Sequence, residues 1–515
     1  MGLINLIKNL DSYTKTELLG SETTRILRLT FSNNEFDALD DSIVNDALLI
    51  QRGSEMLQSL TLRRKLVDAL KKEQLQSLGI RSYDDALDRY KNLELFVRDF
   101  QIEEEYLLKD PIDDRNKLEI INPSHNDNIR IAAYPHEYQK RLKDKLLSKL
   151  LETNQQKILC SMPTGAGKTV LAMELIVDLI RFSKVLNSKS LQIVWLVSSK
   201  ELAEQSLQSF KKIWNQKGDH PARCQRFFGR FDSIEVTTDS TVTFATFDLL
   251  VARLETTYSK KLLEATDYLF IDEAHHSEAF TYEKVILEYQ DLNSKFNIIG
   301  LTATPFRVED TEFDHFKQNF NHFEQLTNER SEIIESPIQY LINGQYLAQI
   351  DYRILNNSEG NIGEAEYYRS LNNAVLQECI QLHERKENTI IFAKSKSHAI
   401  ALSIFLKKEG LNNGLIVGET PDVIRKKLLT DFANKENDLN ILVNHLILST
   451  GIDVPGMNSI MILGDINSPS LGLQILGRAM RGPKNGGNKQ NFIYLTKQNF
   501  NRLSDYKLLE TIVLN

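Results

Sequence analysis

Apolar residues recur at two different spacings along the chain, and the spacing changes after the first quarter. Up to about residue 125 the sequence is rich in Leu, Lys, Glu, Asp and Arg, and Leu62, Leu66 and Leu70 recur at the spacing of one helix face. The first proline is Pro111, so no earlier residue has the locked backbone that ends helices. We therefore expect residues 1–125 to form a mostly α-helical domain.

The pattern of apolar residues changes after a short turn-rich segment, residues 122–128 (Asn-Pro-Ser-His-Asn-Asp-Asn). We interpret this segment as a linker because these residue types favour turns. Beyond it, short β-branched apolar runs alternate with amphipathic helical stretches, an order that is typical of a parallel sheet covered by helices. The predicted strands of this first set are 158–160, 193–197, 242–245, 268–271 and 298–301.

A second set of apolar runs repeats this order towards the C-terminus. Between the sets, residues 306–352 are charged and aromatic and lack strand alternation, so we interpret them as a connection. The predicted fold is α/β, with two tandem parallel-sheet domains after the helical one. The predicted boundaries are 1–125 (helical), 126–335 (first sheet domain), 336–352 (connection) and 353–515 (second sheet domain). The strands of the second set are 389–392, 414–417, 441–443, 460–463 and 492–495, with a helix at 397–408.

Composition restricts the class of protein without naming a function. With 515 residues, 41% hydrophobic and 26% charged, the chain resembles ordinary folded proteins. We expect no membrane span, because no window approaches 18 uninterrupted apolar residues, and no secretory signal. Three cysteines provide neither a disulfide framework nor a four-cysteine zinc site, which favours a reducing, cytoplasmic location.

Charge is distributed unevenly along the chain. The formal net charge is −8, and residues 1–125 hold 17 Lys and Arg against 23 Asp and Glu. A negative chain is not drawn to nucleic acid as a whole, so phosphate binding would need a local basic lining. For the acidic helical domain we consider two roles. It either docks a partner, such as a separately encoded nuclease, or braces the first sheet domain.

Residues 162–169 (Met-Pro-Thr-Gly-Ala-Gly-Lys-Thr) follow a predicted strand and open a predicted helix, which is the setting of a phosphate-binding loop. Lys168 would neutralise phosphate charge, and the Thr169 hydroxyl would hold Mg²⁺. The strict motif begins with glycine, where this chain has methionine, and the loop alone could be a glycine-rich turn that binds nothing. The loop residues expected to contact a nucleotide are Thr164, Gly165, Gly167, Lys168 and Thr169.

Two adjacent carboxylates, Asp272 and Glu273, follow the buried run 268–271. Asp272 could help to hold Mg²⁺, while Glu273 could orient or deprotonate an attacking water. Such a pair is usually just solvated. Its position about a hundred residues after the phosphate loop, in the same predicted sheet, makes the interpretation more specific.

With these features the sequence resembles the superfamily 2 helicases and translocases, and residues 272–275 (Asp-Glu-Ala-His) match their DEAH variant. The resemblance covers residues 130–515 and implies two RecA-like domains that share ATP and Mg²⁺. In the first domain it implies that Gln139 reads adenine. The residues it implies for gripping the nucleic-acid backbone are Ser199, Lys200 and Thr246, and those for coupling the two sites are Thr302 and Thr304.

The second unit continues the resemblance. Residues 474–481 (Gln-Ile-Leu-Gly-Arg-Ala-Met-Arg) match the sixth motif, Gln-x-x-Gly-Arg-x-x-Arg, which implies catalytic roles for Gln474, Arg478 and Arg481. By resemblance, the two arginines reach across an inter-domain cleft to the γ-phosphate, so that ATP closes the domains and hydrolysis reopens them. The remaining implied residues are Lys394 and Thr450 for nucleic acid and Asp453 for nucleotide.

The resemblance is nearest to the branch of restriction-enzyme motors and repair translocases. This implies an ATP-driven motor on duplex DNA, in a bacterial defence, restriction or repair assembly. Two other functions stay open on the same motifs: an ATP-gated nucleic-acid sensor or scaffold that recruits a partner without translocation, and an RNA helicase. The adjacent His275 and His276 point in different directions and have no further ligand nearby in the sequence, so we expect no zinc site there.

Overall fold

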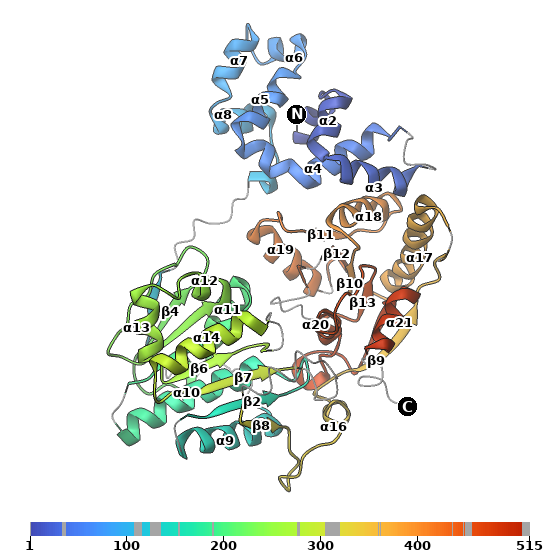
Figure 1. Ribbon diagram of the computed structural model, residues 1–515. Helices are drawn as coiled ribbons and strands as arrows, with labels where there is room; N and C mark the ends of the chain where they lie inside the picture. Colours follow the sequence, from blue (N-terminus) through green and yellow to red (C-terminus); the bar gives the residue numbers. More distant parts are fainter. Residues whose placement is uncertain are drawn as a thin grey trace.

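The computed structural model contains a helical N-terminal domain and two α/β lobes (Figure 1). The residues that it describes are 2–32, 38–107, 116–123, 135–152, 155–187, 190–274, 279–303, 320–358, 360, 362–434, 436–445, 447–448 and 456–506. The predicted fold class is confirmed. Among the described residues, no helix combines the length and the apolar run that crossing a bilayer requires.

The first lobe is built on an eight-stranded sheet with the order β1-β4-β5-β3-β6-β7-β2-β8. Every neighbouring pair is parallel except β1 and β4, which run antiparallel. The strands are β1 (Leu118–Ile121), β2 (Lys157–Ser161), β3 (Gln192–Val197), β4 (Ala222–Phe227), β5 (Thr241–Thr246), β6 (Tyr268–Ile271), β7 (Ile298–Thr302) and β8 (His322–Gln325). The helices are α9 (Glu137–Glu152), α10 (Lys168–Asn187), α11 (Lys200–Lys217), α12 (Phe247–Ala252), α13 (Thr257–Ala265) and α14 (Ala279–Leu292).

The second lobe has a parallel six-stranded sheet with the order β11-β12-β10-β13-β14-β9. Its strands are β9 (Gln349–Ile354), β10 (Thr389–Phe392), β11 (Gly414–Ile416), β12 (Ile441–Asn444), β13 (Ser459–Ile462) and β14 (Gln490–Leu495). Helix α16 (Pro337–Asn343) precedes this lobe. The helices of the lobe are α17 (Glu364–Glu384), α18 (Lys396–Lys408), α19 (Asp422–Ala433), α20 (Pro469–Ala479) and α21 (Lys497–Asp505), and a 3-10 turn, η2, covers Pro483–Asn485.

All ten predicted strands are present, and four others were not anticipated: β1, β4, β8 and β9. β1 lies on the N-terminal side of the boundary predicted at residue 125, yet it belongs to the first sheet. β9 begins inside the predicted connection 336–352 and forms an edge of the second sheet. The sequence did not predict β4 because this strand contains the charged residue Arg226, which is buried beside Glu119 and Glu204.

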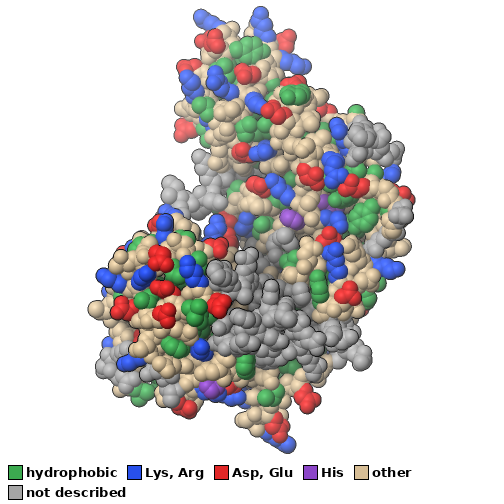
Figure 2. Space-filling view, viewed as in Figure 1, with side chains coloured by type: hydrophobic (Ala, Val, Ile, Leu, Met, Phe, Trp, Pro, Cys, Tyr) green, Lys and Arg blue, Asp and Glu red, His purple; other side chains and the backbone are tan. Residues whose placement is uncertain are grey.

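The N-terminal domain consists of short helices that enclose an apolar core. The leucine-rich stretch from residue 62 is divided at residues 69–71 into two helices, α5 and α6. Acidic and basic side chains are interspersed over the face of this domain that Figure 2 shows. The helices are α1 (Leu3–Lys8), α2 (Ser12–Leu19), α3 (Ser21–Phe31), α4 (Asp41–Gln58), α5 (Leu60–Asp68), α6 (Lys72–Ser77), α7 (Tyr83–Arg89) and α8 (Leu93–Phe100), followed by the 3-10 turn η1 (Glu104–Leu107).

In the part of the chain that the structure describes, the apolar core of the helical domain continues into the second lobe and not into the first. α3 lies against α17 and α18 (Figure 1), and the apolar core of the domain continues into Tyr368, Ile400, Ala401 and Ile404 of that lobe. The alternative that this domain braces the first sheet domain is therefore wrong about the lobe it contacts. The second-lobe residues of this shared core belong to α17 and α18, and Leu415 of β11 packs against it.

Candidate active site between the two lobes

The loop between β2 and α10 has the backbone of a phosphate cradle. Gly165 and Gly167 both adopt φ +79°, a left-handed conformation that favours glycine. The hydroxyl oxygen of Thr164 is buried and has no hydrogen-bond partner among the described residues. The loop leads into the N-terminus of a 20-residue helix, where backbone N–H groups and the helix dipole favour an anion. These features fit a bound phosphate chain.

Two side chains from α9 support the loop. The Gln139 side-chain amide and the Tyr138 hydroxyl each donate a hydrogen bond to the Ala166 carbonyl oxygen, at 2.9 Å in both cases. The Gln139 oxygen accepts a bond from the backbone N–H of His136 at 2.8 Å. Gln139 is therefore buried and attached directly to the loop. Its contact with adenine stays a prediction.

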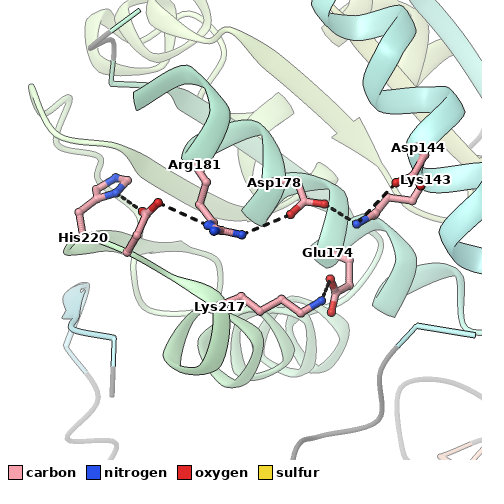
Figure 3. A network of polar contacts seen from close by, with 8 residues as sticks. Lys143, Asp144, Glu174, Asp178, Arg181, Lys217 and His220 are labelled. Carbon is pink, nitrogen blue, oxygen red and sulfur yellow. Dashed lines mark hydrogen bonds and ion pairs between the residues drawn. The ribbon is translucent and has the colours of Figure 1, made fainter. Parts of the chain in front are cut away.

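Ion pairs hold α10 between its neighbouring helices, and these pairs follow α10 in Figure 3. Lys143 of α9 pairs with Asp178 of α10, and Lys217 of α11 pairs with the almost fully buried Glu174 of α10. Because buried carboxylates are costly without a partner, these pairs fix the register of the three helices. They thereby fix the position of Lys168, the first residue of α10.

The acidic pair at the end of β6 faces the start of α10. The Thr169 hydroxyl donates to Asp272 Oδ2 at 3.3 Å, and Lys168 Nζ lies 3.4 Å from Glu273 Oε1. The backbone N–H of Glu273 donates to Asp272 Oδ1 at 3.0 Å, with Glu273 at φ +47°, an uncommon conformation for a non-glycine residue. The structure thus brings together these four predicted residues.

Burial dominates the electrostatics of this corner. It raises the pKa of Asp272 to about 7, and the negative charge of Glu273 adds to the effect, while Lys168 opposes it. A nearby divalent cation would favour the charged carboxylate. The hydroxyl of Thr169 and the carboxylate of Asp272 are oxygen ligands of the kind that Mg²⁺ prefers. The donor set therefore fits Mg²⁺ beside a phosphate chain.

Thr302 lies directly beneath the phosphate loop. It is the last residue of β7, fully buried, and its carbonyl oxygen accepts a bond from Met162 N–H at 3.0 Å. The segment after β6 is joined to β7 as well, since the Ala274 backbone N–H donates to the Leu301 carbonyl oxygen at 2.8 Å. The end of β7 thus connects the segment that bears the acidic pair, through Leu301, with the loop, through Thr302. Thr304, predicted to act with it, lies outside the described residues.

The second lobe meets the phosphate loop through the end of α20. A Cβ atom on Gly477 would collide with the Thr164 side chain, so only a glycine permits this approach. A Cβ atom on Gly165 would lie 3.5 Å from the Gly477 carbonyl oxygen and 3.6 Å from Met480 Cβ. Gln474 and Arg478 lie on α20 itself and Arg481 follows its end. The sixth motif is therefore adjacent to the loop that carries Lys168.

The backbone around Arg481 is fixed by the connection between the lobes. Arg481 forms a β-bridge with Leu347, and the Met480 carbonyl accepts a bond from Ala348 N–H at 2.9 Å. A further contact joins the lobes nearby, between His136 Nε2 and Asn485 Oδ1 at 2.7 Å. Sequence reasoning missed this pair, and a separation of 349 residues left no local signal that could have found it.

The first-lobe residues that are predicted to contact nucleic acid lie at the C-terminal ends of the neighbouring strands β3 and β5. Val197 pairs with Thr246 across β3 and β5, so Thr246 lies beside the turn that holds Ser199 and Lys200. Ser199 caps α11 by accepting a bond from Leu202 N–H at 3.3 Å, and Lys200 is exposed. In the second lobe, Lys394 follows β10. The predicted residues Thr450 and Asp453, and the pair His275 and His276, lie outside the described residues.

Comparisons with known proteins agree with this arrangement. Residues 133–307 match the family model "Type III restriction enzyme, res subunit", and residues 371–483 match "Helicase conserved C-terminal domain". The chain is 25% identical over 363 residues to the candidate ATP-dependent helicase IRC3 of Saccharomyces cerevisiae, covering 68% of this chain and 50% of that protein. It is 25% identical over 414 residues to the type I restriction enzyme EcoKI endonuclease subunit of Escherichia coli, covering 69% and 34%.

A solved structure supports the fold. S. cerevisiae Dbp5, bound to RNA and ADP BeF3, superposes with a TM-score of 0.50 at 18% identity, covering 73% of this chain and 88% of that one. At this identity the likeness concerns the fold alone, which is a pair of RecA-like domains. The chain spans about half the length of the curated helicase relatives it matches.

Proposed function

Because this chain belongs to helicase superfamily 2, on the branch that resembles restriction-enzyme motors, we propose that it is a nucleic-acid-dependent ATPase that moves along or remodels DNA. The observation that carries the proposal is the contact between Gly477 and Thr164. It brings the sixth motif of one lobe against the phosphate loop of the other, so that groups from both lobes can act on one triphosphate.

We assign the first lobe's residues to binding and hydrolysis. When bound, ATP supplies the bond whose hydrolysis drives the cycle, and Mg²⁺ neutralises phosphate charge. Lys168 and the loop N–H groups would hold the phosphates, and Thr169 with Asp272 would hold the metal. Glu273 would orient water and accept its proton. The sequence Asp-Glu-Ala-His at 272–275 favours the DEAH type.

The second lobe would complete the site. Arg478 and Arg481 would supply fixed positive charge where negative charge develops on the transferred phosphoryl group. Thr302, hydrogen-bonded to the start of the loop, is placed to transmit the state of the nucleotide site through the sheet. Ser199, Lys200, Thr246 and Lys394 would hold the sugar-phosphate backbone, which gives binding with little dependence on base sequence.

We propose duplex DNA as the track because a restriction-enzyme family model covers the first lobe and the EcoKI endonuclease subunit is among the relatives. The same likeness favours a separately encoded partner, such as a nuclease, that uses the exposed surface of the helical domain. A reducing compartment such as the cytoplasm suits the three cysteines, which are all unpaired and buried.

The test is the ATPase rate with duplex DNA, single-stranded DNA and RNA, for the wild type and for Lys168→Ala and Glu273→Gln. Removal of the phosphate-binding cation should lower the rate at least about 100-fold, and removal of the base about 10²–10⁴-fold. Lys157→Ala is the control, because Lys157 begins β2, the strand that leads into the phosphate loop, at the end away from the loop. Undiminished hydrolysis in Lys168→Ala or Glu273→Gln would refute the site.

Translocation is measured separately with a DNA triplex. A motor strips the third strand from the duplex when ATP is hydrolysed, whereas a nucleotide-gated switch does not. The wild type should displace the strand, and Glu273→Gln should not. Strong stimulation by RNA together with intact triplex would instead identify an RNA-remodelling enzyme.

A further inference from the structure

A buried chain of hydrogen bonds joins the helical domain to the loop that carries Lys394. The loop lies between β10 and α18, and Lys394 is one of the residues that the proposed function places on the DNA backbone. The consequence of this chain for nucleic-acid binding rests on the proposed function, whereas the hydrogen bonds themselves can be tested without it.

The first part of the chain lies at the start of α18. The backbone N–H of Lys394 donates to the ring nitrogen Nδ1 of His398 at 3.2 Å. The backbone N–H of His398 donates to the Ser395 hydroxyl oxygen at 3.0 Å. The Ser395 hydroxyl caps α18, and the bond to His398 fixes the backbone of the residue before the cap, so that together they fix the path of the loop. His398 is fully buried. Since its Nδ1 accepts a bond, the ring proton of the neutral imidazole must be on Nε2.

The second part crosses to the helical domain. His398 Nε2 lies 2.9 Å from Asn372 Oδ1 of α17, so the ring donates to the amide oxygen. The Asn372 side-chain nitrogen then donates to the Thr30 hydroxyl oxygen of α3 at 3.5 Å. The Thr30 hydroxyl in turn donates a hydrogen bond to the Ile26 carbonyl oxygen at 2.8 Å. Each hydrogen bond thus has a defined donor and a defined acceptor, from α3 to the backbone of Lys394.

Independent contacts hold the two sides together around this chain. The Thr23 and Ser397 hydroxyls are 3.1 Å apart in the buried interface, and Arg25 pairs with Glu364 at 2.5 Å. The Tyr368 ring packs edge-on against His398 with the centroids 5.1 Å apart. The chain is therefore enclosed within the apolar core shared by the two parts, where an unmade hydrogen bond is costly.

Lys394 itself lies at a functional position of the second sheet. β10 and β13 flank the point where the strand order reverses, and ligands of open α/β sheets bind at the C-terminal ends of such strands. A cavity of about 180 Å³ opens there, lined in part by Lys394, His445 and Asp465. Lys394 Nζ reaches the Tyr367 hydroxyl at 3.4 Å and Asp465 Oδ1 at 3.6 Å. A small shift of the loop would move this cation.

We propose that helix α3 positions the β10–α18 loop for contact with nucleic acid, through Thr30, Asn372 and His398 as positioning residues. The helical domain then contributes to nucleic-acid binding by the second lobe, although it does not itself contact the nucleic acid. A ligand or partner that displaced α3 would weaken that grip without touching the track, because it would remove the last acceptor of the chain.

Thr30→Val tests the proposal in the full-length protein, since valine keeps the shape of threonine and removes the hydroxyl. Hydrogen exchange at the Lys394 amide should become about three- to tenfold faster, and the Kd for fluorescently labelled duplex DNA should rise by a similar factor of about three to ten. The ATPase rate without DNA should not change. His398→Leu should raise the exchange rate and the Kd for DNA at least as much as Thr30→Val does. His398→Asn can keep an acceptor for the Lys394 N–H, so its Kd for DNA should lie closer to that of the wild type.

Two controls come from the same helix. Thr24 bonds to the Gly20 carbonyl at 2.9 Å and has no part in the chain, so Thr24→Val controls for the loss of a helix-bound hydroxyl. Thr23→Val removes an interface bond outside the chain. Neither should change exchange at Lys394 or DNA affinity.

If Thr30→Val matches Thr24→Val in both measurements, or if Thr23→Val has the same effect as Thr30→Val, the proposal is wrong. If wild-type protein neither binds DNA nor is stimulated by it, the proposed function fails. Exchange at the Lys394 amide then still decides whether α3 positions the loop.

Discussion

The second lobe forms two interfaces that are built in opposite ways. Against the first lobe, the contact near the nucleotide site depends on close backbone approach at glycines, with Gly477 against Thr164 and Gly165 beside Met480. Against the helical domain, side chains interlock in a shared apolar core that contains Tyr368, Ile400 and Ile404. At the nucleotide site the contact is made by glycine backbone, whereas the helical domain meets the second lobe through interlocked apolar side chains.

The difference teaches which parts of the chain move together. Each fully buried Ile contributes about 1.5–3 kcal/mol relative to an exposed one, and a polar chain that is satisfied only in the docked arrangement adds to the cost of separation. At the nucleotide site the lobes meet through glycines, and beside this contact Leu301 of the first lobe and Met480 of the second belong to one buried apolar cluster. We therefore expect the hinge of the ATP cycle between the two lobes, with the helical domain carried by the second.

The largest effect is expected from Gly477→Val, which tests the glycine interface. A side chain at this position collides with Thr164, so α20 and its arginines must move back from the phosphate loop. Because cross-lobe arginines can contribute about 10³–10⁵ in rate, DNA-stimulated ATP hydrolysis should fall about 1,000-fold or more. ATP affinity, measured with a fluorescent analogue, should change much less, since the loop stays intact.

Gly418→Val is the control for this substitution. Gly418 belongs to the same lobe, and a Cβ atom there meets no other atom within 4 Å. Its ATPase rate should match that of the wild type. Near-normal turnover in Gly477→Val would show that the lobes do not need this contact, and the contrast between the two interfaces would lose its basis.

Ile404→Asp tests the interlocked interface. Ile404 is 2% exposed at the junction with the helical domain, so the substitution loses apolar burial and places a charge without a partner in the core. The free energy of unfolding should fall by about 3–5 kcal/mol, measured by urea denaturation, and the helical domain should become sensitive to protease.

Ile354→Asp provides the matched control, because Ile354 is in the same lobe and 50% exposed. Its cost should stay below about 1 kcal/mol. Equal destabilisation by both substitutions would mean that the helical domain adds nothing to the second lobe. Deletion of residues 1–125 is a less informative experiment, because it would expose the apolar residues of α18 and also remove β1 from the first sheet.

The sequence predicted the central strands because apolar runs such as those of β3 and β6 are buried on both faces, where composition alone indicates a strand. It missed three of the four edge strands, β1, β8 and β9, for the same physical reason, whereas the edge strand β11 was predicted. β1 and β8 lie at the rims of the first sheet and carry polar residues. β4 contains Arg226, whose burial depends on Glu119 and Glu204 from other elements, and no local pattern encodes such a partner.

The candidate site divides in a similar way. The motif spacing predicted that Lys168, Thr169, Asp272 and Glu273 would meet, because the ends of parallel strands share one edge of a sheet. The link between His136 and Asn485, and the chain from Thr30 to Lys394, depend on packing between distant segments. The brace alternative named the first lobe, whereas the helical domain contacts the second, because in the sequence the relevant faces of α3 and α18 look like ordinary amphipathic surfaces.

The smallest expected effect concerns pH and the interlocked interface. Burial lowers the pKa of His398 to about 3, with smaller contributions in the same direction from Lys394 and His445. In the unfolded chain the histidine pKa is about 6.5, so the unfolded state binds a proton that the folded state excludes. The stabilisation is complete above pH 6.5 and is lost progressively as the pH falls towards 3.

Between pH 7.5 and pH 5.0 this single group should lower the free energy of unfolding by about 2 kcal/mol. The measurement is urea denaturation of the wild type and of His398→Asn at both pH values, since the other histidines titrate in both proteins and cancel in the comparison. The wild type should lose about 2 kcal/mol more than the variant. Equal losses would mean that His398 is not held neutral in the shared core, and the hydrogen-bond directions derived for the chain to Thr30 would then have to be reversed or abandoned.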